Sequence, residues 1–324
     1  MREHSGFFRT FVLMDMIAII IGIALVLWGA DRLTDGAVAV AQRMGIPQIV
    51  IGLTIVAFGT SMPEFCSSLV SALNHQPGMA VGNVVGSNIF NALLIVGAAA
   101  IVAPITILPS TVKKDIPFAL ISSVLLVMLC GFDGKIQWYD AVIMLVFFII
   151  FMYMTLKEAK SGKIQEEESE TKKKPMSKLM SIVWIVVGLA CLIGGSTIFV
   201  NGASSLAATL GVDPAIIGLT IVAMGTSLPE LATSVVSASK GNSGIAIGNV
   251  LGSNVFNILF ILGVTGVICP LDIQGITTLD LSVMVIAMIL LWLFSYTKLR
   301  IERWEGVVLV LVFAAYMFVL IKNA

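Results

Sequence analysis

Long apolar stretches alternate with short polar turns along almost the whole chain. Ten of these stretches are each long enough to cross about 30 Å of hydrocarbon as a helix. They are residues 13–41, 47–73, 78–103, 116–132, 138–156, 181–208, 214–239, 244–268, 279–297 and 304–321. We therefore predict an all-α polytopic membrane protein with ten transmembrane helices, with the lipid bilayer as the solvent for much of its surface.

The composition supports this class. The chain is 58% hydrophobic and 12% charged, with a mean hydropathy of +1.03. A soluble domain of 324 residues could not bury that much apolar surface. The formal net charge is zero, which gives no indication of a nucleic-acid partner. The cysteines stand singly in apolar runs, so we expect small hydrophobes rather than a redox or metal pair.

A polar segment at residues 157–178 separates the fifth and sixth apolar stretches. It holds seven lysines and five glutamates and has almost nothing to bury, so we expect a solvated linker. The chain then divides into a first unit at 1–156, a linker at 157–180 and a second unit at 181–324. Each unit contains five of the ten predicted helices.

The distribution of Lys and Arg predicts the orientation in the membrane. With the N-terminus outside, 14 basic residues fall on the inner side, seven of them in the linker, and four fall outside. Cytoplasmic loops carry the excess of positive charge in membrane proteins. We therefore expect a multi-pass protein of the cell membrane with both termini outside and the linker in the cytoplasm.

Two forty-residue segments of the chain are nearly the same. Residues 52–91 and 218–257 align without a gap at an offset of 166 and agree at 25 of 40 positions. Gly29 and Gly36 match Gly195 and Gly202 at the same offset, so we expect the first span to belong to the repeated fold rather than to a cleaved signal peptide. Five spans per unit is an odd number, which predicts two inverted five-helix repeats with a site at their interface.

Both repeats carry one glutamate inside an apolar stretch, Glu64 in the first and Glu230 in the second. A carboxylate at membrane depth costs about 3 kcal/mol on insertion scales and usually marks a function. Apart from Arg32 and the span-end Lys240, no basic residue lies where it could neutralise them. We predict that the two glutamates share one site.

Each glutamate ends a G-T-S-x-P-E core, formed by Gly59 to Glu64 and Gly225 to Glu230. On a helix, the Thr and Ser lie four and three residues before the Glu and share its face. Pro63 lacks an amide hydrogen and clashes with the carbonyl of Gly59, so we predict a kink that frees carbonyl oxygens around Ala57 to Thr60. Carbonyl, hydroxyl and carboxylate oxygens together favour a hard cation such as Ca²⁺ or Na⁺.

A second core, G-N-V-x-G-S-N-x-F-N, spans Gly82 to Asn91 and Gly248 to Asn257. Its Ser and last Asn are four residues apart and share a helix face. The glycines permit close helix crossing. They do not form a Walker motif, so we expect no ATP-driven pump. A lone membrane Ser or Thr commonly bonds its own i−4 carbonyl, and a lone Asn commonly joins helices. We expect Asp31, Arg32 and Asp35 in the first span to pair locally.

These duplicated motifs resemble the α-repeats of the cation/Ca²⁺ antiporter superfamily, most closely the prokaryotic sodium/calcium exchangers. The resemblance covers essentially the whole chain. It implies transported Na⁺ and Ca²⁺, no cofactor, function as a monomer, and access that alternates as the first and sixth spans slide past the other helices. It also implies ion ligands at Glu64, Glu230, Thr60, Thr226, Ser61, Ser227, Ala57, Ala223, Ser87, Asn91, Ser253 and Asn257. Some relatives carry Asp at the position of Asn257. In this chain both repeats have Asn at that position, so the site keeps two carboxylates.

Two ionised carboxylates neutralise one Ca²⁺ and could also hold two or three Na⁺ ions. Exchange of three Na⁺ for one Ca²⁺ would move one net charge, worth about 2.3 kcal/mol per 100 mV. We expect electrogenic Na⁺/Ca²⁺ exchange. A Ca²⁺/H⁺ antiporter is the alternative within this class, because a glutamate can release Ca²⁺ by taking up a proton. A passive cation channel is the alternative from another class. An enzyme is not expected, since no nucleophile and base pair is evident.

Overall fold

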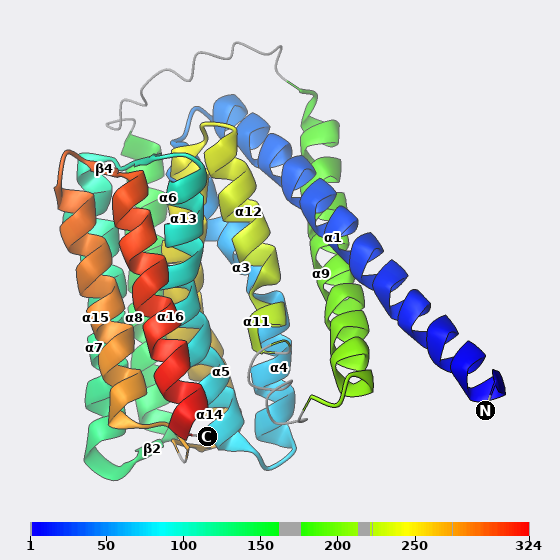
Figure 1. Ribbon diagram of the computed structural model, residues 1–324. Coiled ribbons are helices and arrows are strands. Elements are labelled where there is room, and N and C mark those ends of the chain that lie inside the picture. Colours follow the sequence, from blue (N-terminus) through cyan, green and yellow to red (C-terminus); the bar gives the residue numbers. More distant parts are fainter. Residues whose placement is uncertain (1, 162–175, 213–220, 222, 274, 324) are drawn as a thin grey trace.

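The computed structural model describes residues 2–161, 176–212, 221, 223–273 and 275–323 (Figure 1). It is almost entirely helical, and helices occupy the described parts of the ten predicted ranges. The long uninterrupted helices are α1 (Arg2–Met44), α7 (Ile116–Asp133), α8 (Trp138–Ser161), α9 (Lys178–Thr209), α15 (Thr278–Tyr296) and α16 (Arg303–Asn323).

The remaining predicted spans are broken into shorter pieces. The second contains α2 (Gln48–Ile51), η1 (Gly52–Val56), α3 (Ala57–Thr60) and α4 (Met62–Leu73). The third contains α5 (Pro77–Ile89), η2 (Phe90–Ile95) and α6 (Val96–Val102). The seventh contains α11 (Ala223–Thr226) and α12 (Leu228–Ser239), and the eighth contains α13 (Ser243–Val255), η5 (Phe256–Ile261) and α14 (Leu262–Ile268). The η segments are π-helical turns, which occur frequently at functional sites.

Seven described helices are long and apolar enough to cross a membrane. A bent pair, Gln48–Thr60 with Met62–Leu73, would make an eighth span. Residues 214–220 and 222 of the seventh predicted span, and residue 213 just before it, lie outside the described residues, as does most of the linker. A polytopic helical membrane protein is therefore confirmed, whereas the number ten stays a prediction.

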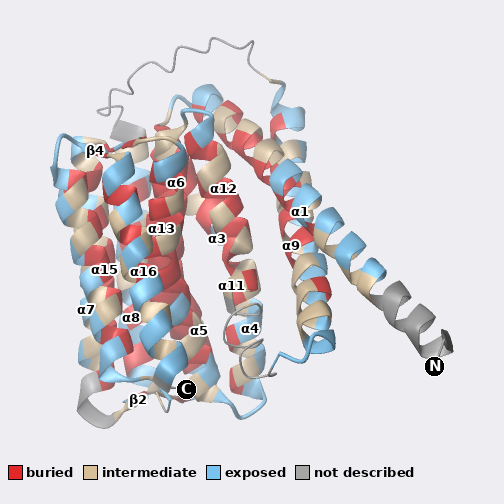
Figure 2. Ribbon diagram, viewed as in Figure 1, coloured by how far each residue is buried: buried red, intermediate tan, exposed pale blue. Residues whose placement is uncertain are grey.

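The core lies around α5–α6 and α13–α14. The most apolar windows of these two spans are each 78% buried, against 17% for α1 and 28% for α8 and α9 (Figure 2). Large apolar side chains on the outer helices are instead exposed, for example Ile20, Ile149 and Phe318. An outside covered by apolar side chains fits a lipid solvent.

Helices α1 and α9 pack tightly against each other at one side of the bundle (Figure 1). Their glycines recur every seven residues, at 22, 29 and 36 on α1 and at 188, 195 and 202 on α9. A Cβ added at Gly29 would lie 2.8 Å from the Gly188 carbonyl oxygen, and one at Gly22 would lie 2.8 Å from the Gly195 carbonyl oxygen. The pairing register makes the two helices antiparallel, and only glycine permits this backbone contact.

Two short antiparallel ribbons, which the sequence did not predict, join the two units. Strand β1 (Ile105–Thr106) pairs with β4 (Arg300–Ile301), and β2 (Lys135–Ile136) pairs with β3 (Leu271–Asp272). The segment η3 (Thr111–Asp115) follows β1 and leads into α7. Each ribbon links one strand from either unit, so the units are tied together outside the helical core as well as within it.

Candidate cation-binding site

The helical backbone breaks immediately before each repeated glutamate. Ser61 has φ −83° and ψ 5°, and Ser227 has φ −89° and ψ 8°, both outside the helical range. The two helix axes around Ser61 differ by 45°. Pro63 has no amide hydrogen for the Gly59 carbonyl, so the helical ladder loses a bond at this point. The kink predicted from Pro63 is confirmed.

Each break places a glutamate in the first turn of a new helix. Glu64 lies on α4 and is 0% exposed, and Glu230 lies on α12 and is 1% exposed. The free amides at a helix N-terminus favour a negative charge. Among the ion pairs of the described residues, none involves either glutamate. Both acids are thus buried without a cationic side chain beside them.

The serines of the G-T-S-x-P-E cores bond across the two repeats. Ser61 Oγ donates to Glu230 Oε1 at 3.0 Å, and Ser227 Oγ donates to Glu64 Oε1 at 2.8 Å. Since Ser227 and Glu230 are three residues apart on one chain segment, this contact brings the two carboxyl groups within about one helical turn of each other. The two predicted acids therefore lie at one site.

The serines of the second core also reach this site. Ser87 on α5 lies with its Oγ 3.2 Å from Ser227 Oγ. Ser253 on α13 donates to Glu230 Oε1 at 3.5 Å. Helices α5 and α13 are the most buried of the bundle, so the site lies within the protein core.

Several buried polar atoms of the two glutamates and of the repeated second core have no hydrogen-bond partner. They include Oε2 of Glu64, Oε2 of Glu230, Oδ1 of Asn91, and both Oδ1 and Nδ2 of Asn257. Asn91 and Asn257 lie in the π-helical turns η2 and η5. The Asn91 amide nitrogen instead donates to Asn254 Oδ1 at 3.1 Å. A buried carboxylate oxygen without a partner is costly, and a bound cation would remove that cost.

The threonine and alanine of the first core lie beside the break. Thr60 Oγ1 is within hydrogen-bond distance of Val56 O, Ala57 O and Asn249 Oδ1, at 3.1, 3.4 and 3.0 Å. The Ala57 carbonyl also accepts from the Ser61 amide at 3.0 Å. The Thr60 hydroxyl therefore has protein partners already, and its carbonyl is the better candidate ligand. In the second repeat Ala223 begins α11 and Thr226 ends it.

Three asparagines that sequence reasoning did not single out also contact this region. Asn83 and Asn249 bond the segments that carry the glutamates, and Asn254 bonds Asn91. All three belong to the repeated G-N-V-x-G-S-N-x-F-N core, and their repetition in a buried helix was the available signal.

The donor set suits a hard cation. It consists of hydroxyl, amide and carbonyl oxygens with two carboxylates, which are the ligands of Ca²⁺ and Na⁺ rather than of zinc or copper. The described residues contain no group of three or more His, Cys, Asp or Glu side chains that could hold a metal ion.

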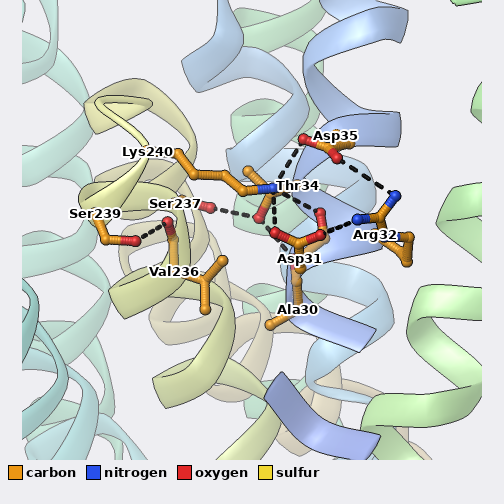
Figure 3. A network of polar contacts seen from close by, with 9 residues as sticks. All are labelled: Ala30, Asp31, Arg32, Thr34, Asp35, Val236, Ser237, Ser239 and Lys240. Atoms are coloured by element: carbon orange, nitrogen blue, oxygen red, sulfur yellow. Dashed lines mark hydrogen bonds and ion pairs between the residues drawn. The ribbon is translucent and has the colours of Figure 1, made fainter. Parts of the chain in front are cut away.

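A separate cluster of charges joins α1 to the end of α12 (Figure 3). We call it the α1–α12 ion cluster, and it consists of Asp31, Arg32, Asp35 and Lys240. Lys240 Nζ lies 2.5 Å from Asp31 Oδ1 and 2.8 Å from Asp35 Oδ1. Arg32 pairs with both aspartates, as the sequence predicted, and its guanidinium also lies 5.1 Å from the ring centroid of Trp184 on α9.

A hydroxyl contact lies next to this ion cluster. Thr34 Oγ1 on α1 and Ser237 Oγ on α12 are 2.9 Å apart and fully buried (Figure 3). Together with the ion pairs, this contact connects α1 with α12, the helix that carries Glu230.

Fold and site together define a polytopic helical membrane protein with two buried acids at one candidate cation site, an arrangement typical of secondary transporters. The family described as "Sodium/calcium exchanger protein" matches residues 14–157 and 180–322. The chain belongs to this family, within the prokaryotic type of the cation/Ca²⁺ antiporter superfamily.

Individual relatives agree with this assignment over nearly the whole chain. The putative antiporter CaxA of Alkalimonas amylolytica is 38% identical, covering 96% of this chain and 100% of that protein. The sodium/calcium exchanger MaX1 of Methanosarcina acetivorans is 32% identical, covering 95% of this chain and 99% of that protein. A solved structure of the sodium-calcium exchanger NCX_Mj, soaked with 100 mM Na⁺ and 10 mM Sr²⁺, superimposes with a TM-score of 0.82 at 31% identity. That superposition covers 94% of this chain and 98% of NCX_Mj.

Proposed function

We propose that this protein is a secondary active antiporter that exchanges Na⁺ for Ca²⁺ across the cell membrane. The observation that carries the proposal is the pair of buried glutamates, Glu64 and Glu230, each with one oxygen bonded by a serine of the other repeat and one oxygen unpartnered. This arrangement offers two negative charges to one small volume, and among the described residues no ion pair involves either glutamate.

Charge balance supports exchange of these two ions. One Ca²⁺ neutralises both carboxylates, and two or three Na⁺ ions can replace it on the same oxygens. The empty site leaves two buried charges uncompensated. The protein therefore switches the opening of the site from one side of the membrane to the other far less readily when the site is empty than when it is loaded. Obligatory loading of this kind produces exchange rather than uniport. With three Na⁺ per Ca²⁺, one net charge moves per cycle and the reaction is electrogenic.

The transport ligands in this proposal are the residues that the family resemblance implies at the repeated cores. Glu64 and Glu230 supply the charge. Neutral oxygens come from Thr60, Ser61, Thr226 and Ser227, from the carbonyls of Ala57 and Ala223, and from Ser87, Asn91, Ser253 and Asn257. The crossed serine contacts and the unpartnered oxygens support this set.

Alternating access follows from the proposed inverted repeat. The units at 1–156 and 181–324 would each contribute five helices, ten in all, in opposite orientations. The antiparallel packing of α1 against α9, whose glycines match at the offset of 166, supports the inversion. We propose a functional monomer with both termini outside and the linker in the cytoplasm.

Uptake into proteoliposomes tests the coupling ion. The purified protein is reconstituted, the vesicles are loaded with Na⁺, and ⁴⁵Ca²⁺ uptake is measured in Na⁺-free medium. We expect uptake that requires internal Na⁺ and that is stimulated by an inside-positive potential set with K⁺ and valinomycin. Vesicles with Na⁺ on both sides serve as the control, and they should take up far less Ca²⁺.

The same vesicles separate the alternatives. Uptake driven by a pH gradient alone, with no Na⁺ present, would assign a Ca²⁺/H⁺ antiporter and reject the Na⁺-coupled proposal. Uptake that needs neither gradient would assign a channel.

A further inference from the structure

Asn83 on α5 and Asn249 on α13 make the same contacts in the two repeats. The Asn83 Nδ2 donates to the Glu64 carbonyl oxygen at 3.3 Å and to Ser68 Oγ at 3.0 Å. The Asn249 Nδ2 donates to the Glu230 carbonyl oxygen at 3.3 Å and to Ser234 Oγ at 3.0 Å. Each amide therefore joins a core helix to the first turns of the helix that carries the site glutamate.

The side-chain oxygen of Asn249 makes a further contact that crosses between the repeats. It accepts from Thr60 Oγ1 at 3.0 Å. The orientation of this amide follows from its partners, because only the nitrogen can donate to a backbone carbonyl. One fully buried side chain thus fixes the Glu230 backbone in its own repeat and Thr60 in the other.

These contacts lie where the glutamate helices need support. Helix α12 begins at Leu228, only two residues before Glu230, and the break at Ser227 interrupts the ladder that would otherwise hold its first turn. A helix start without a continuous ladder gains its position from tertiary contacts. The Asn249 amide supplies one of these contacts at the residue whose carboxylate faces the site.

Asn249 is not itself a candidate ligand. Its nitrogen has two acceptors and its oxygen has one donor, so each polar atom is engaged with protein. Asn257 differs, because both polar atoms of its amide lack a partner. Residues that hold ligands without touching the ion commonly change metal affinity about 10–100-fold when mutated.

We propose that Asn249, with Asn83 as its counterpart, is a positioning residue of the cation site. It holds the Glu230 segment and Thr60 in the mutual arrangement in which both repeats present oxygens to one ion. This inference rests on the proposed function, since it assigns a role at the same site. It adds residues outside the predicted ligand set.

The test uses Asn249→Ala and Asn249→Asp in the full chain. Alanine removes all three contacts, and aspartate keeps the shape while losing the two N–H donors. We expect both variants to raise the KM for Ca²⁺ in proteoliposome uptake by about 10-fold or more, with a smaller change in maximal rate. Asn83→Ala should act in the same direction.

Asn88→Ala is the matched control. Asn88 is also buried on α5, but its amide nitrogen bonds Val84 O within its own helix at 2.7 Å, its Oδ1 has no partner, and no described hydrogen bond joins it to either glutamate segment. It should leave the KM for Ca²⁺ unchanged. Ser234→Ala removes one of the three Asn249 contacts and should give an intermediate KM.

A second readout on the purified protein separates positioning from general stability. Ligand binding raises Tm by an amount that grows with the logarithm of the ligand concentration divided by its Kd for the folded state. We expect 10 mM Ca²⁺ to raise the Tm of the wild type and of Asn88→Ala, and to raise that of Asn249→Asp much less. A purely structural role would lower the ion-free Tm but leave the KM and the Ca²⁺-induced Tm increase at wild-type values, and that result would overturn the inference.

The wild type separates this inference from the proposed function. A wild type with neither Na⁺-dependent uptake nor a Ca²⁺-induced rise in Tm would overturn the proposed function and the positioning role together. A wild type with both, alongside Asn249 variants that match it, would overturn the positioning role alone.

Discussion

Ser227 in the second repeat donates a hydrogen bond to Glu64 in the first, with 2.8 Å between Oγ and Oε1. The reciprocal bond runs from Ser61 to Glu230. Each acid is therefore held by the opposite repeat, so neither repeat can present its carboxylate correctly without the other. A substitution at Ser227 therefore removes a contact of Glu64, 163 residues away in the chain, and one at Ser61 removes a contact of Glu230, 169 residues away.

Ser227→Ala is expected to weaken Ca²⁺ binding. It removes a hydrogen bond to a carboxylate, which contributes about 1.5–3 kcal/mol, so the KM for Ca²⁺ should rise about tenfold or more. Uptake of ⁴⁵Ca²⁺ over a range of Ca²⁺ concentrations measures this. Ser239→Ala is a suitable control, because Ser239 is exposed and bonds only the Val236 carbonyl among the contacts described. Equal KM values for Ser227→Ala and the wild type would contradict the crossed arrangement.

Glu64→Gln and Glu230→Gln should each abolish Ca²⁺ transport. Glutamine keeps the shape of the side chain but removes one of the two charges that balance Ca²⁺. Because an uncharged side chain inserts into a membrane more easily than a charged one, both variants should still reach the membrane fraction. Immunoblots of that fraction and ⁴⁵Ca²⁺ uptake provide the measurements. Full exchange by either variant would mean that its carboxylate is not part of the site.

Asn257→Asp should change the ion dependence of transport. Both polar atoms of the Asn257 amide are buried without a partner. If Asn257 is a ligand, as proposed, a carboxylate in its place would add a third negative charge to the site. We expect altered apparent affinities for Na⁺ and Ca²⁺, measured as the Na⁺ concentration that half-inhibits ⁴⁵Ca²⁺ uptake and the KM for Ca²⁺. Identical Na⁺ and Ca²⁺ dependence in variant and wild type would show that position 257 lies outside the coordination shell.

Lys240→Met should loosen the contact between α1 and α12. The substitution leaves Asp31 and Asp35 beside each other with only Arg32 as a counter-charge. These side chains are about 30% exposed, so water screens the pairs and we expect a loss of about 1 kcal/mol, or about 2–4 °C in Tm. The difference should shrink at high salt. Lys322→Met, at the exposed end of α16, controls for loss of a lysine, and an equal Tm change in both variants would contradict the prediction.

Asp115, which lies outside the membrane spans, makes the free energy of unfolding depend on pH. Burial, followed by the nearby Glu158 carboxylate, raises the pKa of Asp115 to about 7. In the unfolded chain the group ionises near pH 4. The folded state therefore holds an extra proton between about pH 4 and pH 7, and the free energy of unfolding falls as pH rises through that window.

Asp115→Asn removes this contribution to the pH dependence of the free energy of unfolding. Relative to the wild type, its Tm should be higher at pH 8, and the difference should become smaller at pH 5. Melting of the purified protein across this range measures the difference. A Tm difference that does not vary between pH 5 and pH 8 would argue against the raised pKa.

The sequence predicted the local features of the site but not its cross-connections. The break before Glu64 follows from Pro63, whose missing amide acts within one helical turn. The bonds of Ser61 to Glu230 and of Asn249 to Thr60 depend on how two distant segments pack, and no local pattern encodes that distance. The duplication indicated that the two acids meet, whereas it did not indicate which oxygens they use.

The charged residues of the first span were likewise only partly predictable from the sequence. Arg32 and its neighbouring aspartates could be paired from their spacing alone, because they occupy adjacent positions on one helix. Lys240 joins them from more than 200 residues away. The π-helical turns η2 and η5 were also missed, since their residues read as ordinary apolar helix.

The seven-residue glycine spacing on α1 and α9 has a mechanical consequence. Where one backbone lies against another without side chains between them, neither helix can tilt or translate much without carrying its companion. We therefore expect the two helices to move together as one unit. Arg32 adds a further link between them, because it pairs with Asp31 on α1 and lies over the Trp184 ring on α9. A bulky residue at Gly29 or Gly188 would push α1 and α9 apart and uncouple their movements.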